Sequence, residues 1–208
     1  MSLYRRYILP GLIDWACSQP TGMQQREKVV PLAWGRVLEV GIGSGMNLSY
    51  YEGARVSHLT AIDPMEKLWN RRKVDLASLD FEVEYIKGSA HRISFGDGSF
   101  DTVVSTSTLC SIKPIEEALK EIYRVLKPGG KLLFAEHGSA PDTSLARRQN
   151  LLNPLWKRIG GGCNLNRNIP ALLKSAGFQL EGLSEGYQEG WKPTSYHYWG
   201  WATKVESP

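Results

Sequence analysis

Between residues 36 and 134, short apolar runs rich in β-branched residues alternate with segments whose apolar residues recur at helical spacing. Such runs are typical of buried strands, and their alternation with helices predicts parallel strands joined by right-handed crossovers. Helices would then cover both faces of one mainly parallel sheet, which is the α/β class. The expected strands are 37–40, 58–62, 81–86, 100–105 and 131–136, and the expected helices are 65–76 and 115–126.

The residues that follow this pattern predict a different arrangement at the end of the same domain. Two helices are expected at 143–158 and 169–176, and strand-like runs follow at 178–184 and 195–205. Two consecutive strands with no helix between them favour an antiparallel hairpin, which we expect at one edge of the sheet.

The N-terminal segment 1–34 carries apolar side chains at near-helical spacing, from Leu3 and Tyr7 to Leu12 and Trp15. Two interpretations stay open, a helix that packs on the domain and a lid over the mouth of a pocket. Since no linker or repeat divides the chain, we expect a single domain over residues 1–208.

Composition and charge exclude several classes of function. The formal net charge is only +4, and the basic residues form short doublets rather than one long stripe, so a nucleic-acid partner is not expected. No apolar stretch approaches the ~20 residues of a membrane span. Cys17, Cys110 and Cys163 are too far apart in the sequence to indicate a disulfide framework or a metal site. A reducing, cytoplasmic location is the expectation.

A glycine-rich loop follows the first expected strand and carries Gly41, Gly43 and Gly45. Glycines let the backbone turn sharply and let a ligand approach closely, and a helix N-terminus after such a loop would offer free N–H groups. A dinucleotide-binding loop would need a third glycine where Met46 stands, and the lysine of a phosphate-binding P-loop is missing. The spacing therefore indicates another nucleotide-like ligand at the carboxyl ends of the strands.

Asp63 ends the second expected strand, which is the next strand along the chain after the glycine loop. A carboxylate at this position can accept two hydrogen bonds from the diol of a ribose. It can also cap the helix expected after Pro64, and the two roles are compatible.

These motifs resemble those of class I S-adenosylmethionine-dependent methyltransferases, of the type 11 or UbiE-like group. The resemblance implies a Rossmann-like fold, S-adenosylmethionine as cofactor and S-adenosylhomocysteine as product. It divides the chain into an N-terminal segment 1–34, a cofactor-binding core 35–138 and an acceptor-side part 139–208. The family often has an acid where Ser89 stands here. The cofactor-binding residues that it implies are Glu39, Gly41, Gly43, Ser44, Gly45, Asn47, Asp63, Pro64, Met65, Ser89, Ala90, Ser105 and Thr106.

The second half of the chain is similar to a narrower group, the methyltransferase-like thiol S-methyltransferases. The similarity lies in the stretches 108–113, 134–137, 153–156, 162–167 and 196–204. It implies a small, apolar acceptor with a thiol as the methylated group. A thiol with a pKa of ~8.5 is partly ionised near neutral pH, so a strong base is not required.

Four side chains are candidates at the acceptor. His137 follows the fifth strand and is either a proton acceptor or orienting group, or a structural histidine. His197 lines the acceptor pocket or packs in the core. Cys110 and Cys163 are expected to be structural, because buried cysteine usually behaves as a small apolar residue.

Two alternatives to thiol methylation stay open at this point. The acceptor is a quinone ring or a phospholipid headgroup, or the chain is a catalytically idle module that binds S-adenosylmethionine. The loop and Asp63 do not separate these hypotheses, since both features concern the cofactor alone. Nothing in the pattern indicates an oligomeric state.

Overall fold

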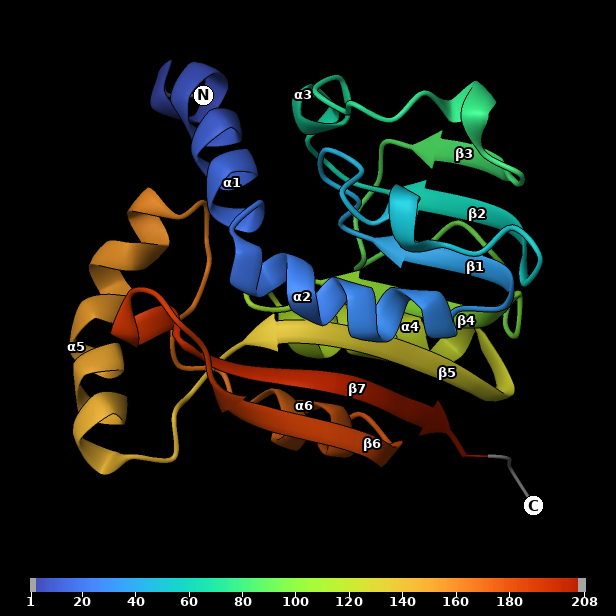
Figure 1. Ribbon diagram of the computed structural model, residues 1–208. Coiled ribbons are helices and arrows are strands. Elements are labelled where there is room, and N and C mark those ends of the chain that lie inside the picture. The colour runs from blue at the N-terminus through green and yellow to red at the C-terminus, as the bar shows by residue number, and fades with distance from the viewer. Residues whose placement is uncertain (1–2, 206–208) are drawn as a thin grey trace.

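The computed structural model describes residues 3–205, and a single seven-stranded sheet forms its centre (Figure 1). The outermost positions of the predicted domain, 1–2 and 206–208, lie outside the described residues. The strand order is β3-β2-β1-β4-β5-β7-β6, and all neighbours are parallel except the pairs that β7 makes. The strands are β1 (Gly35–Val40), β2 (Val56–Ile62), β3 (Glu82–Ile86), β4 (Phe100–Thr106), β5 (Leu126–His137), β6 (Phe178–Tyr187) and β7 (Tyr196–Lys204).

Helices lie on both faces of the sheet, as the sequence predicts. Figure 1 shows α2 in front of the sheet, where it packs on β5 and β7, and α4 and α6 behind it. The α-helices are α1 (Leu9–Cys17), α2 (Pro20–Val29), α3 (Glu66–Trp69), α4 (Ile115–Val125), α5 (Thr143–Ile159) and α6 (Ile169–Ser175). A π-helical turn at Tyr4–Ile8 precedes α1, and 3-10 turns lie at Val30–Leu32, Leu48–Tyr50, Leu76–Ser78 and Lys192–Thr194. Within residues 3–205, no helix is both long and apolar enough to cross a bilayer.

The amphipathic helix α4 shows why these segments fold as they do. Glu116 and Glu117 lie in its first turn and Arg124 in its last, where each charge complements the helix dipole. Its inner face is buried against the sheet and joins the core on that side. The apolar residues of that face are Ile115, Ala118, Leu119, Ile122 and Val125.

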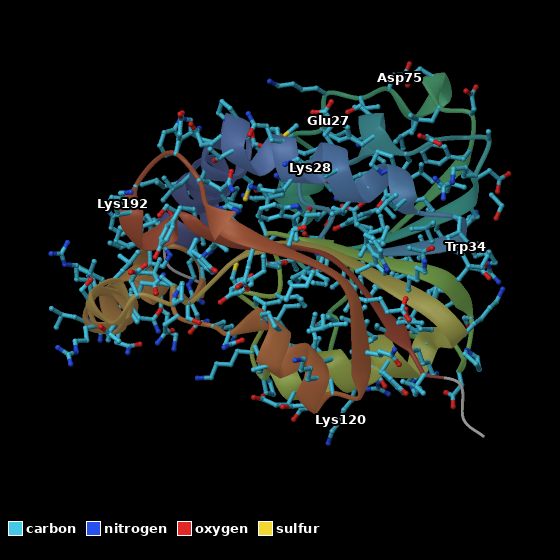
Figure 2. All side chains as sticks on the ribbon, turned by 60° about the horizontal axis from the view of Figure 1, so that its bottom comes forward. Glu27, Lys28, Trp34, Asp75, Lys120 and Lys192 are labelled. Carbon is cyan, nitrogen blue, oxygen red and sulfur yellow. The ribbon has the colours of Figure 1, made fainter. Side chains whose placement is uncertain are left out.

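On the opposite face, α2 separates its charges from the core in the same way. Glu27 and Lys28 are exposed, as Figure 2 shows, whereas Val29 is buried in the second apolar cluster. The ammonium of Lys28 lies 5.1 Å from the ring centre of Trp199 on β7, which ties the helix to the sheet.

The expected helix after the glycine loop is not formed. The loop continues as turns into the short 3-10 turn at Leu48–Tyr50, so the prediction of a helix N-terminus at this point was wrong. The side-chain amide of Asn47 donates hydrogen bonds to Glu39 and Thr106.

The helix predicted at 65–76 is also much shorter, since α3 ends at Trp69. The two basic side chains that follow α3 make different contacts. Arg71 forms an ion pair with Asp14 of α1 at 3.4 Å, and the guanidinium of Arg72 stacks 4.7 Å above the Trp69 ring. The ion pair of Arg71 joins this segment to α1, and the chain does not continue the helix that its periodicity predicts.

The predicted C-terminal hairpin is confirmed, with β7 between β5 and the edge strand β6. Its register requires glycine at one position. Gly200 has φ +144°, and a Cβ atom there would lie 1.5 Å from the carbonyl oxygen of Gly182 on β6. The two strands therefore approach closely at this point.

The N-terminal segment reaches across the carboxyl ends of the strands. Asp14 accepts a hydrogen bond from Ser44 in the glycine loop at 2.5 Å, and the Tyr4 hydroxyl donates to the carbonyl of Ile159 at the end of α5. The outer side of this segment is apolar and exposed, at 77% for Leu3 and 64% for Trp15.

Candidate active site

The glycine loop makes a tight turn at the carboxyl end of β1. Gly41, Gly43 and Gly45 all have positive φ, at 77°, 55° and 72°. A Cβ on Gly41 would lie 2.3 Å from the Thr108 hydroxyl oxygen, and one on Gly45 would lie 2.8 Å from Leu48. At Gly43, by contrast, nothing lies within 4 Å of the added atom. The loop is packed from below and open at Gly43, where a ligand can approach the backbone.

Asp63 holds this loop to the end of β2. One carboxylate oxygen accepts the N–H of Gly43 at 2.9 Å, and the other accepts the N–H of Met65 at 2.7 Å. Burial raises the pKa of Asp63, and these two bonds oppose that shift. The carboxylate thus takes the expected position and supports the start of α3, and each oxygen keeps a lone pair for a further donor.

Glu39 lies buried below the loop and is bonded within the protein through both of its carboxylate oxygens. Its two carboxylate oxygens accept hydrogen bonds from Asn47 at 2.8 Å and from the Tyr51 hydroxyl at 2.7 Å. Burial, opposed by these two bonds, raises the pKa of Glu39 to about 7. Asn47 also donates to Thr106 at 3.0 Å, while its own Oδ1 is buried without a partner among the described residues.

The structure places the other predicted cofactor residues around the same edge. The Ser89 hydroxyl bonds to Nδ1 of His91 at 2.7 Å, and Ser105 donates to Glu136 at 3.3 Å. Pro64 is exposed, Met65 half-buried and Ala90 buried. Ser44 is engaged by Asp14 of the covering N-terminal segment rather than free.

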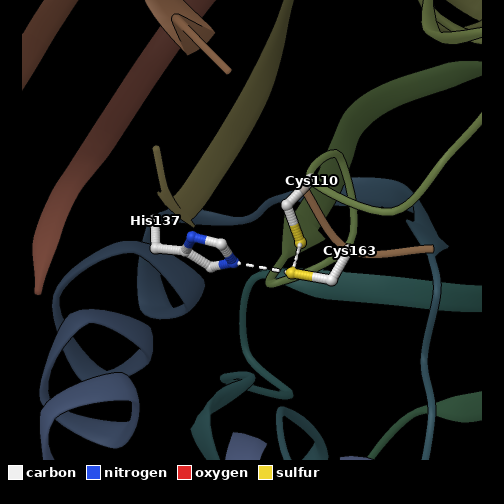
Figure 3. A group of neighbouring side chains, drawn as sticks. All are labelled: Cys110, His137 and Cys163. Carbon is white, nitrogen blue, oxygen red and sulfur yellow. Dashed lines mark hydrogen bonds between the residues drawn. The ribbon is translucent and has the colours of Figure 1, made fainter. Parts of the chain in front are cut away.

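Three side chains that are distant in the sequence meet beside this edge, as Figure 3 shows. Nε2 of His137 lies 3.0 Å from Sγ of Cys163, and that sulfur lies 3.6 Å from Sγ of Cys110. The three possible ligand atoms all lie within 4.8 Å of one another. Cys110 is buried, and the other two side chains are half-buried.

Sequence reasoning missed this group because Cys110, His137 and Cys163 stand in three widely separated segments of the chain. The cysteines carry no local metal or nucleophile motif. The pairing of β4 with β5 places Cys110 near His137, and the segment after α5 folds back to bring Cys163 to them. His137 alone could be placed at the pocket edge, from its position at the end of a strand.

A buried carboxylate and an amide fix the loops that carry the two cysteines. Glu136 accepts backbone N–H groups from Thr108 at 2.8 Å, Leu109 at 2.9 Å and Cys110 at 3.3 Å. Asn164 donates its backbone N–H at 2.9 Å and its side-chain amide at 2.8 Å to the carbonyl of Cys110. Because both loops are tied together, the spacing of the two sulfur atoms is set by the fold.

Comparison with known proteins assigns this combination of loop, acid and sheet to a family. A family model described as a methyltransferase domain matches residues 38–134. Thiol S-methyltransferase TMT1B of Rattus norvegicus is 36% identical over 176 residues, which cover 81% of this chain and 70% of the relative. The chain belongs to the S-adenosylmethionine-dependent methyltransferases.

More distant relatives of this methyltransferase differ in their acceptors. Ubiquinone/menaquinone biosynthesis C-methyltransferase UbiE of Roseobacter denitrificans is 26% identical over 126 residues, covering 59% of this chain and 50% of the relative. A Thermotoga maritima structure described as a possible histamine N-methyltransferase superposes with a TM-score of 0.67, 20% identity and 97% coverage of both chains. A Haloferax volcanii methyltransferase, solved in complex with the activator Trm112, gives 0.72 at 14% identity and 99% coverage. These structures confirm the class I methyltransferase fold.

The pKa values of Cys110 and Cys163 in the methyltransferase shift in opposite directions. A hydrogen bond from Cys110 and the neighbouring His137 hold the pKa of Cys163 well below its usual range, against the effect of burial. The same bond and burial raise the pKa of Cys110. Burial lowers the pKa of His137, but Cys163 outweighs it, and the pKa of His137 lies above its ordinary value. A Cys163 thiolate therefore accepts hydrogen bonds from both neighbours.

His197 lies beside this group on β7, directly opposite His137 in the strand register. Its ring centre is 6.3 Å from that of His137, and its Nε2 lies 3.0 Å from the carbonyl oxygen of Thr194. Burial lowers the pKa of His197 to about 4, so the ring is neutral near neutral pH. The neutral His197 ring therefore lies beside His137 without adding charge to the group of Cys110, His137 and Cys163.

Arg26 on α2 is a further buried cation that sequence reasoning missed. Only 4% of its surface is exposed, and its guanidinium donates to the carbonyl of Cys17 at 3.0 Å. Within residues 3–205 no carboxylate pairs with it, and its Nε has no partner. Its charge is close enough to lower the pKa of Glu39 below the glycine loop. A buried cation without an acid can bind an anionic group.

A groove of about 700 Å³ lies beside the cysteine-bearing loops rather than over the glycine loop. Ser111, Gly162 and Asn164 line it, next to Cys110 and Cys163, and Lys113 and Arg167 add positive charge. The glycine loop itself lies under the N-terminal segment through the bond between Ser44 and Asp14. The groove and the glycine loop are therefore covered differently.

Proposed function

We propose that this methyltransferase transfers the methyl group of S-adenosylmethionine to the sulfur of a small thiol. The observation that carries the proposal is the extent of the similarity to the thiol S-methyltransferase. That match combines 36% identity with coverage of 81% of the chain, whereas a demethylmenaquinone methyltransferase that covers 77% of the chain is 27% identical. Function depends on the particular site and not on the fold, so similarity over the whole domain weighs more than similarity in the cofactor core alone.

The cradle around the glycine loop suits the methionyl end of the cofactor, which carries an ammonium and a carboxylate. The open face of Gly43 admits the methionyl chain, the unpartnered Oδ1 of Asn47 can accept from its ammonium, and Arg26 can bind its carboxylate. Asp63 would use its remaining lone pairs for the ribose hydroxyls. Glu39 would act indirectly, since both its oxygens hold the loop.

Bound S-adenosylmethionine supplies a methyl group that is already activated on a sulfonium. The protein then has to align the acceptor, exclude water and remove one proton. A thiol suits this site because it ionises without a strong base. We assign His137 an orienting role, because its Nε2 is engaged by Cys163 at 3.0 Å.

We also propose that the N-terminal segment acts as a lid. It bonds to the glycine loop through Asp14 and to the end of α5 through Tyr4, so it joins the cofactor side to the acceptor side. Such a segment has to move before either ligand exchanges.

The test is an acceptor screen with purified protein and S-adenosylmethionine. Alkanethiols, a hydroquinone and ethanolamine would each be supplied, and methylated product and S-adenosylhomocysteine quantified together by mass spectrometry. We expect a methyl thioether in equal amount with S-adenosylhomocysteine, from the thiols only. Methylation of the hydroquinone carbon instead would favour the quinone class. Cofactor binding without any turnover would favour an idle binding module.

A further inference from the structure

The group of Cys110, His137 and Cys163 has the dimensions of a metal site. Zinc bonds thiolate at ~2.3 Å and imidazole nitrogen at ~2.0–2.1 Å in a tetrahedral arrangement. These bond lengths imply sulfur atoms about 3.8 Å apart and a sulfur-to-nitrogen distance of about 3.6 Å. The structure has 3.6 Å between the sulfurs and 3.0 Å between Cys163 and His137, with all three atoms within 4.8 Å. An ion at the centre requires only small movements of the side chains.

We propose that Cys110, Cys163 and Nε2 of His137 bind one Zn²⁺ ion, and that the open fourth position takes the sulfur of the substrate thiol. The thiol part of this inference rests on the proposed function above. Among residues 3–205, no fourth His, Cys, Asp or Glu joins the group within the same distance. Three protein ligands and one open position are typical of catalytic rather than structural zinc.

The charges around the group fit a divalent cation. Two thiolates and a neutral imidazole cancel the charge of Zn²⁺, so the occupied site is neutral in its buried position. The surroundings fix the backbone of both cysteine ligands, while Nδ1 of His137 is buried without a partner among residues 3–205. Glu136 holds the backbone of Cys110, and Asn164 joins that backbone to the segment of Cys163. Because these contacts set the ligand spacing, the site exists before the metal binds.

The location fits an acceptor site. Cys110 lies in the loop that follows β4, and His137 ends the neighbouring strand β5. The same loop touches the glycine loop, since the Thr108 hydroxyl donates to the carbonyl of Gly41 at 3.3 Å. A thiol on the metal would therefore lie at the strand edge where the methyl donor is expected.

The chemical step balances without a further reactant. The thiol releases its proton to solvent when its sulfur binds the zinc, as ligands do on metal binding. A lone pair of the bound sulfur forms the new bond to the methyl carbon, and the bond from that carbon to the sulfonium breaks. Its electron pair stays on the departing sulfur and gives neutral S-adenosylhomocysteine. The thioether product carries no charge, binds zinc weakly and leaves. The metal is not oxidised or reduced.

The first experiment measures metal content. Protein purified under reducing conditions and reloaded with zinc chloride alone should hold about one zinc per chain. C110S, C163S and H137A should each lose most of it, whereas C17S, a matched cysteine variant on α1, should keep it. Circular dichroism and calorimetric binding of S-adenosylhomocysteine verify that each variant is folded. Substoichiometric zinc in the wild type, or equal zinc in C163S and C17S, would overturn the metal site.

The second experiment asks whether the substrate sulfur binds the metal. Cobalt would replace zinc, and its absorption bands would be followed as an alkanethiol is added without S-adenosylmethionine. A new sulfur-to-cobalt charge-transfer band should appear with the thiol and not with the matching alcohol. Spectra unchanged by the thiol would overturn the open-position assignment.

Turnover separates the failure of this inference from the failure of the proposed function. Removing zinc with a chelator should abolish thiol methylation while S-adenosylhomocysteine still binds, and zinc chloride should restore it. Full thiol turnover in the zinc-free protein would reject the metal as the ligand of the substrate sulfur and leave the thiol acceptor assigned. Zinc bound at the three ligands without turnover of any thiol would reject the acceptor and leave only a metal site.

Discussion

At the scale of single residues, burial determines what the charged groups of the site can do. The resemblance implies that Glu39 is a cofactor-binding residue, and the structure shows it bonded within the protein to Asn47 and Tyr51. Its sequence position before the first glycine identified its importance but not its partner. The partner depends on Tyr51, whose hydroxyl no motif indicated.

The raised pKa of Glu39 predicts a specific dependence of stability on pH. The folded protein holds the Glu39 proton up to about pH 7, whereas the unfolded chain releases it near 4.5. This contribution is therefore fully present below pH 4.5 and is lost as the pH rises to about 7, by roughly 3 kcal/mol in all. Urea unfolding across this range should show a steeper fall in the wild type than in E39Q, in which the other raised carboxyl groups such as Asp63 remain. Parallel curves would contradict the assignment.

A second prediction concerns Asp63, which we expect to bind the ribose hydroxyls. D63A removes the acceptor for the N–H of Gly43 as well as for the ribose hydroxyls. Hydrogen bonds to a charged group contribute about 1.5–3 kcal/mol each, so the affinity for S-adenosylhomocysteine should fall by at least roughly tenfold. Calorimetric titration measures it, with D75N, an exposed acid away from the loop (Figure 2), as the control. An unchanged affinity in D63A would exclude the ribose contact.

Arg26 can be tested through the carboxylate that we assign to it. R26A should weaken S-adenosylmethionine about tenfold or more, since one buried charge-assisted bond is lost. Decarboxylated S-adenosylmethionine should bind the wild type and R26A equally, which a merely structural role would not produce. R26K should restore part of the difference. A uniform loss for both ligands would argue against the contact.

At the scale of elements, strands were predicted better than the segments between them. The buried runs that became β1, β2, β4 and β5 satisfy their own backbone within the sheet, so local pattern and tertiary structure agree. The residues after Trp69 have helical periodicity but lie outside α3, and Arg71 among them forms an ion pair with Asp14 of α1. A partner as distant in the sequence as Asp14 is from Arg71 cannot be read from local spacing.

The prediction at this scale is that the N-terminal segment slows the release of the cofactor product. D14A removes both the bond to Ser44 and the ion pair with Arg71. Half-exposed contacts of this kind contribute at most about 1 kcal/mol each, so we expect S-adenosylhomocysteine to dissociate several times faster. Stopped-flow displacement measures this rate, and K28A on the outer side of α2 is the control. Equal rates in D14A and wild type would show that the segment does not gate the loop.

At the scale of the whole molecule, the proximity of the glycine loop and Asp63 was predictable, and that of Cys110, His137 and Cys163 was not. The glycine loop and Asp63 follow two consecutive strands, and both fall at adjacent strand ends. Cys110, His137 and Cys163 come instead from the loop after β4, from β5 and from the loop after α5, and only the folded chain shows their proximity. A site assembled across the whole domain leaves no local spacing to recognise.

The contacts of Tyr4 and Asp14 have a consequence for the sequence of events in turnover. One segment touches the end of α5 with Tyr4 and the glycine loop with Asp14, so both ligands would share a single exit. A shared exit makes exchange ordered rather than random, because the ligand deeper in the fold waits for the outer one. The enzyme's steady state would then show competitive inhibition by one product and noncompetitive inhibition by the other. The turnover rate of the enzyme would then be limited by ligand exchange past the N-terminal segment.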